Sequence, residues 1–197
     1  MKCFFFICFA MAILFPSVSV QAGRDYSETP EVKPEMSVEI DEGTPKFIYQ
    51  NRKVVCGLKG HSDGCTRVKF FAELKEADIT PKGELKKIKL KIGFEYIEIE
   101  LSSALQKGSC LFDATLKHEL THLALHRRIL KRFAPEIAKA ALSVAEEIEP
   151  PLTQIKFNRI TRVIEDYLNR MAREDDRQNA LMDSDSAYLH LTSQCLE

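Results

Sequence analysis

The sequence predicts an α+β fold, in which a small antiparallel β-sheet is followed by a helix that carries an H-E-x-x-H motif and by two further helices. Three observations support this prediction. From Lys46 to about Leu101 apolar residues alternate with polar ones, as in strands that have one buried and one exposed face. Beyond Leu101 apolar residues recur every three to four positions, which is the helical period. Strands that precede helices, rather than alternate with them, are typical of α+β domains.

The first 22 residues have the layout of a secretory signal peptide. Lys2 precedes an apolar run from Cys3 to Phe15, and small or aliphatic residues then lead to Ala22. The run is shorter than the roughly 20 residues of a membrane-spanning helix, although an uncleaved N-terminal anchor remains the alternative. We therefore expect cleavage near Gly23 and an exported protein, periplasmic or secreted, with no stable membrane span after cleavage.

Composition limits the classes of function. The chain has 197 residues, 29% of them charged, and a formal net charge of −1, which suggests one domain and provides no basic surface for nucleic acid. Residues 23–45 are rich in Pro, Glu, Ser and Thr and are expected to form a flexible lead-in. The sequence contains no glycine pattern for nucleotides and no G-x-S-x-G element.

Four cysteines remain after signal cleavage: Cys56, Cys65, Cys110 and Cys195. In an exported chain they favour two disulfides, for which three pairings are possible. Cys56 and Cys65 flank a glycine-rich turn, so we favour that pair. Cys110 with Cys195 would then hold the C-terminal tail at the start of the motif helix. A four-cysteine zinc site is the alternative, but the spacing lacks any C-x-x-C pair.

The clearest strand signal is KKIKLKIGFEYIEIEL, residues 86–101. Its apolar residues alternate with lysines at first and with glutamates later, and the phase of the alternation changes near Gly93. Such a change predicts a bulge or a tight reversal at that point.

Three helices are expected in the second half. The first carries the motif and is predicted to end at Pro135, because proline is unfavourable inside a helix. The second covers residues 136–149 and ends at Pro150. The third runs from about Thr153 to Asp176.

The stretch KHELTH, Lys117 to His122, is the strongest candidate for a functional site. His118 and His122 are four positions apart, so on a helix both lie on one face, one turn apart. At that separation two imidazoles can bind one metal ion at roughly 2.0–2.1 Å. Glu119, beside them, could take a proton from water that the metal activates. The motif therefore predicts a metal site with a candidate general base.

At these residues a resemblance becomes clear. HELTH on a helix after a small sheet resembles the zincin metallopeptidases, and the longer stretch from Gly108 to Leu130 resembles a group of small exported bacterial proteins with G-S-C before such a helix. The zincin resemblance implies Zn²⁺ bound by His118 and His122, with Glu119 as general base. It also implies an edge strand that pairs with an extended peptide substrate, and Tyr96 to Leu101 is the strand placed for that role.

The third metal ligand is less well defined. The metzincin pattern is excluded, because Leu125 and Arg128 occupy its glycine and last histidine positions. Gluzincins take a glutamate from a later helix, and of the acidic residues near the end of the second predicted helix we choose Glu146. A solvated acidic helix end is the alternative reading of Glu146.

The three remaining histidines are weaker candidates or have no predicted role in metal binding. His126 lies about 12 Å from His118 along a straight helix, so the two cannot bind the same ion, and we expect a surface residue or a partner behind the ligands. His190 is expected to be a residue of the C-terminal tail without a role at the site, and a ligand or a substrate-polarising group is the alternative. His61 is expected to be exposed.

These observations together predict an exported zinc-dependent metallopeptidase. Its zincin-like α+β domain would span residues 46–180, and its C-terminal tail, residues 181–197, would be tied back by a disulfide. Its partner would be a peptide or protein substrate in the cell envelope. Two alternatives keep the helix without hydrolysis: a non-catalytic envelope protein for binding or structure, and a metal-buffering protein.

Overall fold

The computed structural model describes residues 33–51, 54–56, 61–183, 193 and 195. The predicted signal peptide and His190 lie outside these residues. The elements in chain order are β1 (Glu35–Asp41), β2 (Lys46–Gln50), β3 (Val54–Val55), β4 (His61–Ser62), β5 (Gly64–Ile79), β6 (Leu85–Ser102), α1 (Cys110–Glu146) and α2 (Gln154–Met182).

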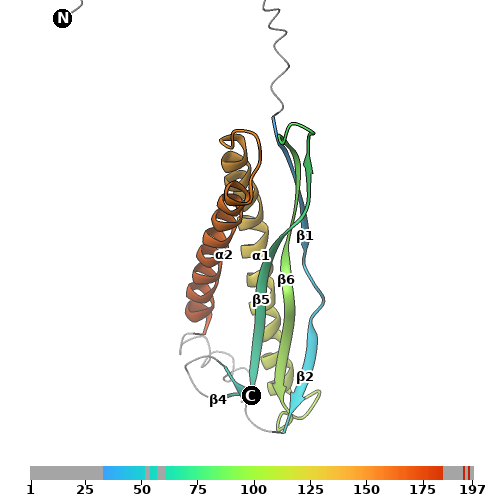
Figure 1. The fold of residues 1–197 in the computed structure, drawn as a ribbon. Coiled ribbons are helices and arrows are strands. Elements are labelled where there is room, and N and C mark those ends of the chain that lie inside the picture. Colours follow the sequence, from blue (N-terminus) through green and yellow to red (C-terminus); the bar gives the residue numbers. More distant parts are fainter. Residues whose placement is uncertain (1–32, 52–53, 57–60, 184–192, 194, 196–197) are drawn as a thin grey trace, which may run out of the picture. The chain divides into compact units, whose positions relative to one another are not determined.

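The main sheet is built around β6, its longest strand. The strand β5 pairs with β6 antiparallel along nearly its whole length, while β1 and β2 pair parallel with the first and second halves of β6. Figure 1 shows β5 on one side of β6, with β1 and β2 on the other. A separate antiparallel ribbon joins β3 to β4.

The predicted fold class, a small antiparallel sheet followed by three helices, is therefore wrong. Two of the three pairings in the main sheet are parallel, and the structure describes two helices. The period-two pattern identified strand residues but carried no information about strand direction. The chain reverses once after β2 and once more between β5 and β6, so β6 runs in the same direction as β1 and β2.

The strand β1 lies inside the segment that composition predicted to be a flexible lead-in. Met36, opposite Ile88, packs partly buried against the core, and Val38 and Ile40 continue this register opposite Leu90 and Ile92. The segment is rich in Pro and Glu, but apolar and polar residues alternate along β1 within it. This short alternation is sufficient for a strand because the long strand β6 is available for pairing.

The phase change near Gly93 is a bulge within β6 and not a reversal. Lys69 pairs with Tyr96 and Phe70 pairs with Phe94, so Glu95 is the extra residue on β6. The glycine itself has a packing reason: a Cβ on Gly93 would lie 2.4 Å from the backbone oxygen of Asp41. Strand β1 can therefore approach β6 closely at this point.

The first helix does not end at Pro135. Helix α1 continues for 37 residues, and Pro135 lies within it. Interior proline costs roughly 3 kcal/mol in helix propensity. On both sides of the proline, however, Phe133, Ala134 and Ile137 are buried in the core. The packing of this continuous apolar face offsets the penalty, so the two helices predicted from the sequence form one.

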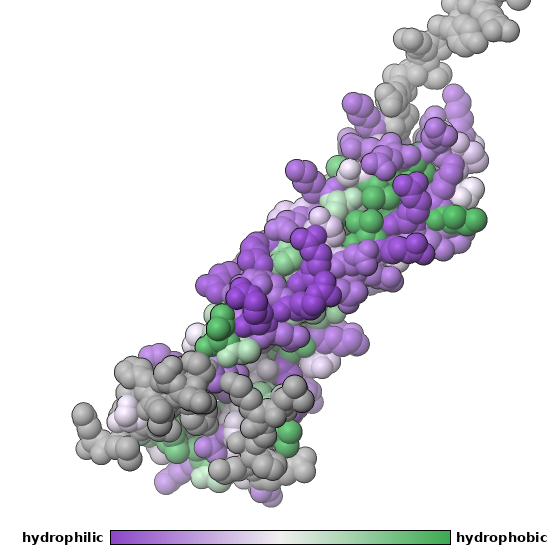
Figure 2. Space-filling model, turned by 90° about the vertical axis from the view of Figure 1, so that its left-hand side faces the viewer, coloured by the Kyte–Doolittle hydropathy of each residue, from purple (hydrophilic) through white to green (hydrophobic). Residues whose placement is uncertain are grey.

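Both helices cover the same face of the sheet. The inward side chains of β6, such as Ile88, Leu90 and Ile99, are completely buried beneath them. Helix α2 lies beside α1 on the β5 side of the sheet (Figure 1), and the outer surface on this side is mainly hydrophilic, with local hydrophobic patches (Figure 2). Neither described helix has an apolar stretch long enough to span a bilayer.

Candidate metal centre

His118 and His122 meet Asp183 at the end of the helix pair. The Nε2 atoms of His118 and His122 lie 3.0 Å apart, and Oδ1 of Asp183 lies 3.1 Å from the first and 2.8 Å from the second. Among the described residues this is the group of His, Cys, Asp and Glu side chains whose ligand atoms converge closely enough for one metal ion. The HExxH histidines therefore supply two of the three groups of this candidate site, and the C-cap residue of a second helix supplies the third.

Local sequence explains why α1 begins where it does. Gly108 adopts a positive φ of 78°, Ser109 is the N-cap and accepts a hydrogen bond from the backbone N–H of Phe112, and Cys110 forms a disulfide with Cys195. The G-S-C element thus supplies a turn, a cap and a covalent anchor for the helix that carries the candidate metal ligands. The histidines follow two and three turns later, on its inner side.

The three converging atoms fit a small transition metal ion. Their separations of 2.8–3.1 Å are slightly shorter than the roughly 3.3 Å expected for tetrahedral ligands bound at 2.0–2.1 Å. Two imidazole nitrogens and one carboxylate oxygen suit zinc and related ions better than calcium or magnesium. A displacement of a few tenths of an ångström would open the group around an ion.

Electrostatics couple Asp183 to the histidines. Partial burial opposes the charge on Asp183, but hydrogen bonds from His118 and His122 outweigh it and hold the pKa of this carboxyl well below its usual range. Burial likewise disfavours the charged form of His122, yet Asp183 and Asn179 raise its pKa. A carboxylate at the C-cap of a helix is unfavourable on its own, because the helix dipole is negative there. A cation close to Asp183 would therefore stabilise its carboxylate at this position.

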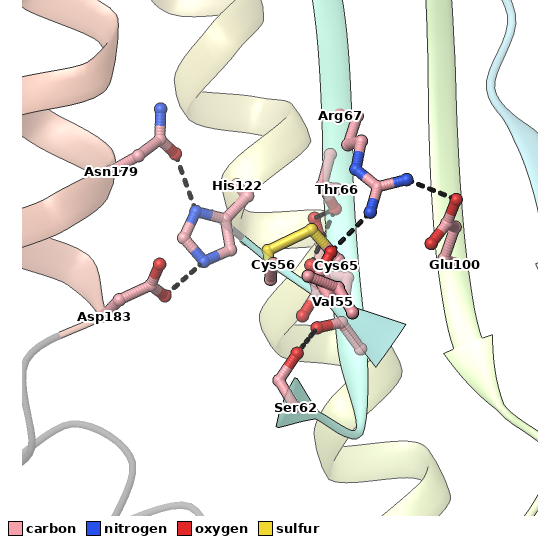
Figure 3. The surroundings of a disulfide bond; sticks show 12 residues. Val55, Cys56, Ser62, Cys65, Thr66, Arg67, Glu100, His122, Asn179 and Asp183 are labelled. Carbon is pink, nitrogen blue, oxygen red and sulfur yellow. Dashed lines mark hydrogen bonds and ion pairs between the residues drawn. A yellow bond between two sulfur atoms is a disulfide. The ribbon is translucent and has the colours of Figure 1, made fainter. Parts of the chain in front are cut away.

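Helices α1 and α2 meet in a regular antiparallel ladder. Successive turns of α1 present a histidine, and successive turns of α2 present its partner: His118 with Asp183, His122 with Asn179, and His126 with Asp175. Figure 3 shows the ring of His122 held between Asn179 and Asp183 of α2. Because both rows advance by four residues, one register of the two helices aligns all three pairs.

Glu119 faces the sheet and the metal cluster at once. Thr66 of β5 donates a hydrogen bond to Oε2 of Glu119 at 2.8 Å. The side chain is 4% exposed, and this burial raises its pKa, against the opposing influence of Thr66 and the two ligand histidines. A carboxyl whose pKa is raised toward neutrality can both accept and return a proton.

Gly64 makes room for this glutamate. A Cβ at position 64 would lie 2.8 Å from Oε1 of Glu119 and 2.8 Å from Cγ2 of Thr115. The adjacent Cys65 is joined to Cys56, which anchors the start of β5 beside the site (Figure 3). Both expected disulfides are thus confirmed, and one fixes the strand under Glu119 while the other fixes the helix that carries it.

Glu146 is not brought to the histidines. Because α1 is continuous, Glu146 is its last residue, exposed and about 36 Å from His122 along the helix axis. Its choice assumed that the helix ended at Pro135 and that a second helix folded back along it. Asp183, which the structure does bring to the site, lies seven residues beyond Asp176, the predicted end of the third helix, and belongs to no known metal-binding motif.

His126 is neither exposed nor a ligand of the same group. It is 5% exposed and its Nδ1 lies 2.7 Å from Oδ1 of Asp175. The expectation of a surface residue is therefore wrong, and that of a partner behind the ligands agrees with its position in the ladder. One sequence signal could have indicated this: Asp175, Asn179 and Asp183 repeat at four-residue spacing, as the histidines do.

The strand expected to receive a peptide is internal. Tyr96 to Leu101 belongs to β6, whose backbone pairs with β5 on one side and with β2 on the other. From Glu98 to Leu101 neighbouring strands occupy both backbone edges of β6, so this part of the strand is not placed to receive a substrate. Among the described strands, β5 is the one that has an outer edge next to Glu119, because β5 pairs with β6 alone in this sheet.

Comparison with known proteins found no matching family model, no matching curated protein and no matching solved structure.

Proposed function

We propose that this chain is an exported zinc-dependent peptidase, with His118, His122 and Asp183 as metal ligands and Glu119 as general base. The observation that carries the proposal is the convergence of two Nε2 atoms and one carboxylate oxygen within 3.1 Å, next to a buried glutamate. Zinc held by these atoms would supply Lewis-acid activation of water and of a peptide carbonyl.

Glu119 has the properties that a proton carrier needs. Its carboxyl interacts electrostatically with His118, His122 and Asp183, which places it beside the cluster without making it a member of the ligand group. With its raised pKa, a Glu119 oxygen can accept a proton from water and deliver it to the leaving amine. Thr66 orients the carboxyl from the neighbouring strand.

A peptide substrate has a plausible place along β5. A groove of about 330 Å³ lies between this strand and α2, with Val68 and Phe70 on one wall and Leu168 and Ala172 on the other. Its β5 wall begins two residues beyond Thr66, which contacts Glu119. An extended peptide could pair with the outer edge of β5 and extend toward the metal ligands. The cell envelope is its proposed location, in agreement with the two disulfides.

A metal-binding protein without turnover is the second candidate. The burial of Glu119 and its bond to Thr66 favour it, because both restrain the side chain. Glu119→Gln separates the two functions. The peptidase should keep about one zinc per chain and lose hydrolysis of a peptide library by at least ~100-fold, in the range typical for a general base. Unchanged hydrolysis in this variant, or none in the zinc-loaded native chain, would reject the peptidase.

A further inference from the structure

The side chain of Asn179 connects the metal centre to the buried part of the helix pair. Its Oδ1 lies 2.7 Å from Nδ1 of His122, and its Nδ2 donates to the backbone oxygen of Asp175 at 2.8 Å. Asn179 therefore spans one turn of α2 and touches the ligand ring on the side away from Asp183 (Figure 3).

The backbone oxygen of Asp175 determines the direction of both hydrogen bonds made by Asn179. A backbone carbonyl can only accept, so the amide group of Asn179 must turn its NH₂ toward Asp175. Its oxygen then faces His122, and this oxygen can also only accept. Nδ1 of His122 must consequently carry a proton.

This protonation has a consequence for metal binding. When a metal ion displaces the Nε2 proton that the ring shares with Asp183, a ring whose Nδ1 keeps its proton offers the ion only the lone pair of Nε2. Nε2 of His122 is the atom that lies 3.0 Å from Nε2 of His118 and 2.8 Å from Oδ1 of Asp183. The arrangement thus selects the nitrogen that faces the other two ligands.

The anchor of Asn179 is itself held in place. The carboxylate of Asp175 lies 2.7 and 2.9 Å, through its two oxygens, from Nδ1 of His126, and both residues are 5% exposed. This buried pair joins α1 to α2 one turn beyond Asn179. It keeps the backbone of Asp175 at the position from which its carbonyl orients the amide.

We propose that Asn179 is a positioning residue that fixes His122 in the Nδ1-protonated form, with the His126–Asp175 pair holding its amide in the required orientation. The inference rests on the metal site of the proposed function and is independent of peptide hydrolysis. To act in this way, residue 179 must place an acceptor oxygen opposite Nδ1 of His122. A side chain of similar volume without such an oxygen could not replace Asn179.

The test compares zinc affinity, by competition with a chromophoric chelator, among full-chain variants with intact disulfides. Asn179→Leu removes the acceptor and should weaken binding about 10- to 100-fold, the usual effect of losing an outer-shell partner. Asn179→Asp keeps an oxygen toward His122 but loses the N–H that is donated to Asp175, and it should weaken zinc binding less than Asn179→Leu does. Asn169→Leu, at an exposed position of the same helix, is the matched control and should change nothing. If the leucine variant does not fold, Asn179→Ala replaces it.

Ring ¹⁵N spectra of the zinc-loaded chain give a second readout, which a purely structural role would not change. In the native chain His122 should have a protonated Nδ1 and a metal-bound Nε2, and this preference should weaken in Asn179→Leu. Equal affinity of the leucine variant and the native chain, equal losses for leucine and aspartate, or ligation through Nδ1 would each overturn the inference. Zinc binding without hydrolysis would reject the peptidase alone, whereas a native chain that binds no zinc would reject both.

Discussion

Oδ1 of Asp183 lies 2.8 Å from Nε2 of His122, although 61 residues separate them in the chain. A motif of five residues is thereby completed by a side chain at the C-cap of another helix. The contact depends on the register of α1 against α2, since the same register also aligns Asn179 with His122 and Asp175 with His126.

Asp183→Ala should abolish tight zinc binding. The variant loses one of three ligands, so its affinity should fall by more than the ~10- to 100-fold that outer-shell changes produce. Competition with a chelator measures this loss. Glu146→Ala, which removes the ligand expected from sequence, and Asp176→Ala, on an exposed position of α2, should both bind as the native chain does. A normal affinity in Asp183→Ala would show that these three residues are not the ligand set.

Gly64→Ala should separate zinc binding from turnover. The added methyl group would lie 2.8 Å from Oε1 of Glu119, so the carboxyl must move, while the metal ligands are not among the nearest atoms to the new group. We expect about one zinc per chain with peptide hydrolysis reduced at least ~10-fold, because small displacements of a catalytic group have large effects on rate. The same methyl group also meets Cγ2 of Thr115. This second contact should lower the stability of the Gly64→Ala variant. The double variant Gly64→Ala/Thr115→Ser removes the contact with Cγ2 but not the contact with Glu119, so it should recover stability without recovering hydrolysis. A full recovery of the rate of hydrolysis would contradict the role given to Glu119.

His126→Leu should destabilise the protein strongly. It leaves the carboxyl group of Asp175 buried without its hydrogen-bonding partner on α1. Breaking a buried pair in this way costs about 3–5 kcal/mol of unfolding free energy, which urea denaturation would detect. The double variant His126→Leu/Asp175→Leu removes both polar groups and should recover much of the loss. Equal stability of the native chain and the single variant would mean that the pair does not stabilise the helix interface.

The metal-free chain should lose stability as the pH rises above neutrality. The pKa of His122 is raised in the folded state, so the folded chain binds its proton more tightly than the unfolded chain does. The resulting stabilisation is complete below the unfolded pKa of about 6.5 and is lost as pH rises through the folded value. Urea midpoints measured with chelator at pH 6 and pH 8 should show this decrease.

Asp183→Asn provides the control for that decrease, because it removes the negative charge that helps to raise the pKa of His122 and leaves only a neutral amide oxygen as acceptor. Its urea midpoint should change less between the two pH values than that of the native chain. An equal or larger change in the variant would assign the pH dependence to other groups. Zinc should remove the decrease in the native chain, since it binds neutral imidazole.

Sequence alone identified the elements with strong local signals. The alternation in residues 86–101 located β6, and the turn between Cys56 and Cys65 indicated their disulfide. The sequence also placed His118, Glu119 and His122 on one helix. These features depend on neighbours within a few residues, where periodicity and spacing are informative.

The features that sequence did not predict depend on long-range pairing. The predicted antiparallel pairing of the strands was wrong, because apolar and polar residues alternate in the same way in parallel and antiparallel strands. Pro135 was taken as a helix end because its penalty is local, whereas the compensating burial of Phe133 and Ile137 is tertiary. Asp183 was missed because the four-residue repeat that it forms with Asp175 and Asn179 acquires a meaning only when α2 docks on α1 and pairs this row with the histidines.

The order of the elements along the chain has a consequence for biogenesis. Synthesis proceeds from the N-terminus, so β1, β2, β5, β6 and α1 all precede the residue that completes the ligand group. A nascent chain that ends after α1 would carry both motif histidines, with His126 still lacking Asp175. Under the proposed ligand set, complete metal ligation would have to wait until α2 has been made and has docked, so a truncated chain would hold the HExxH motif without the third ligand.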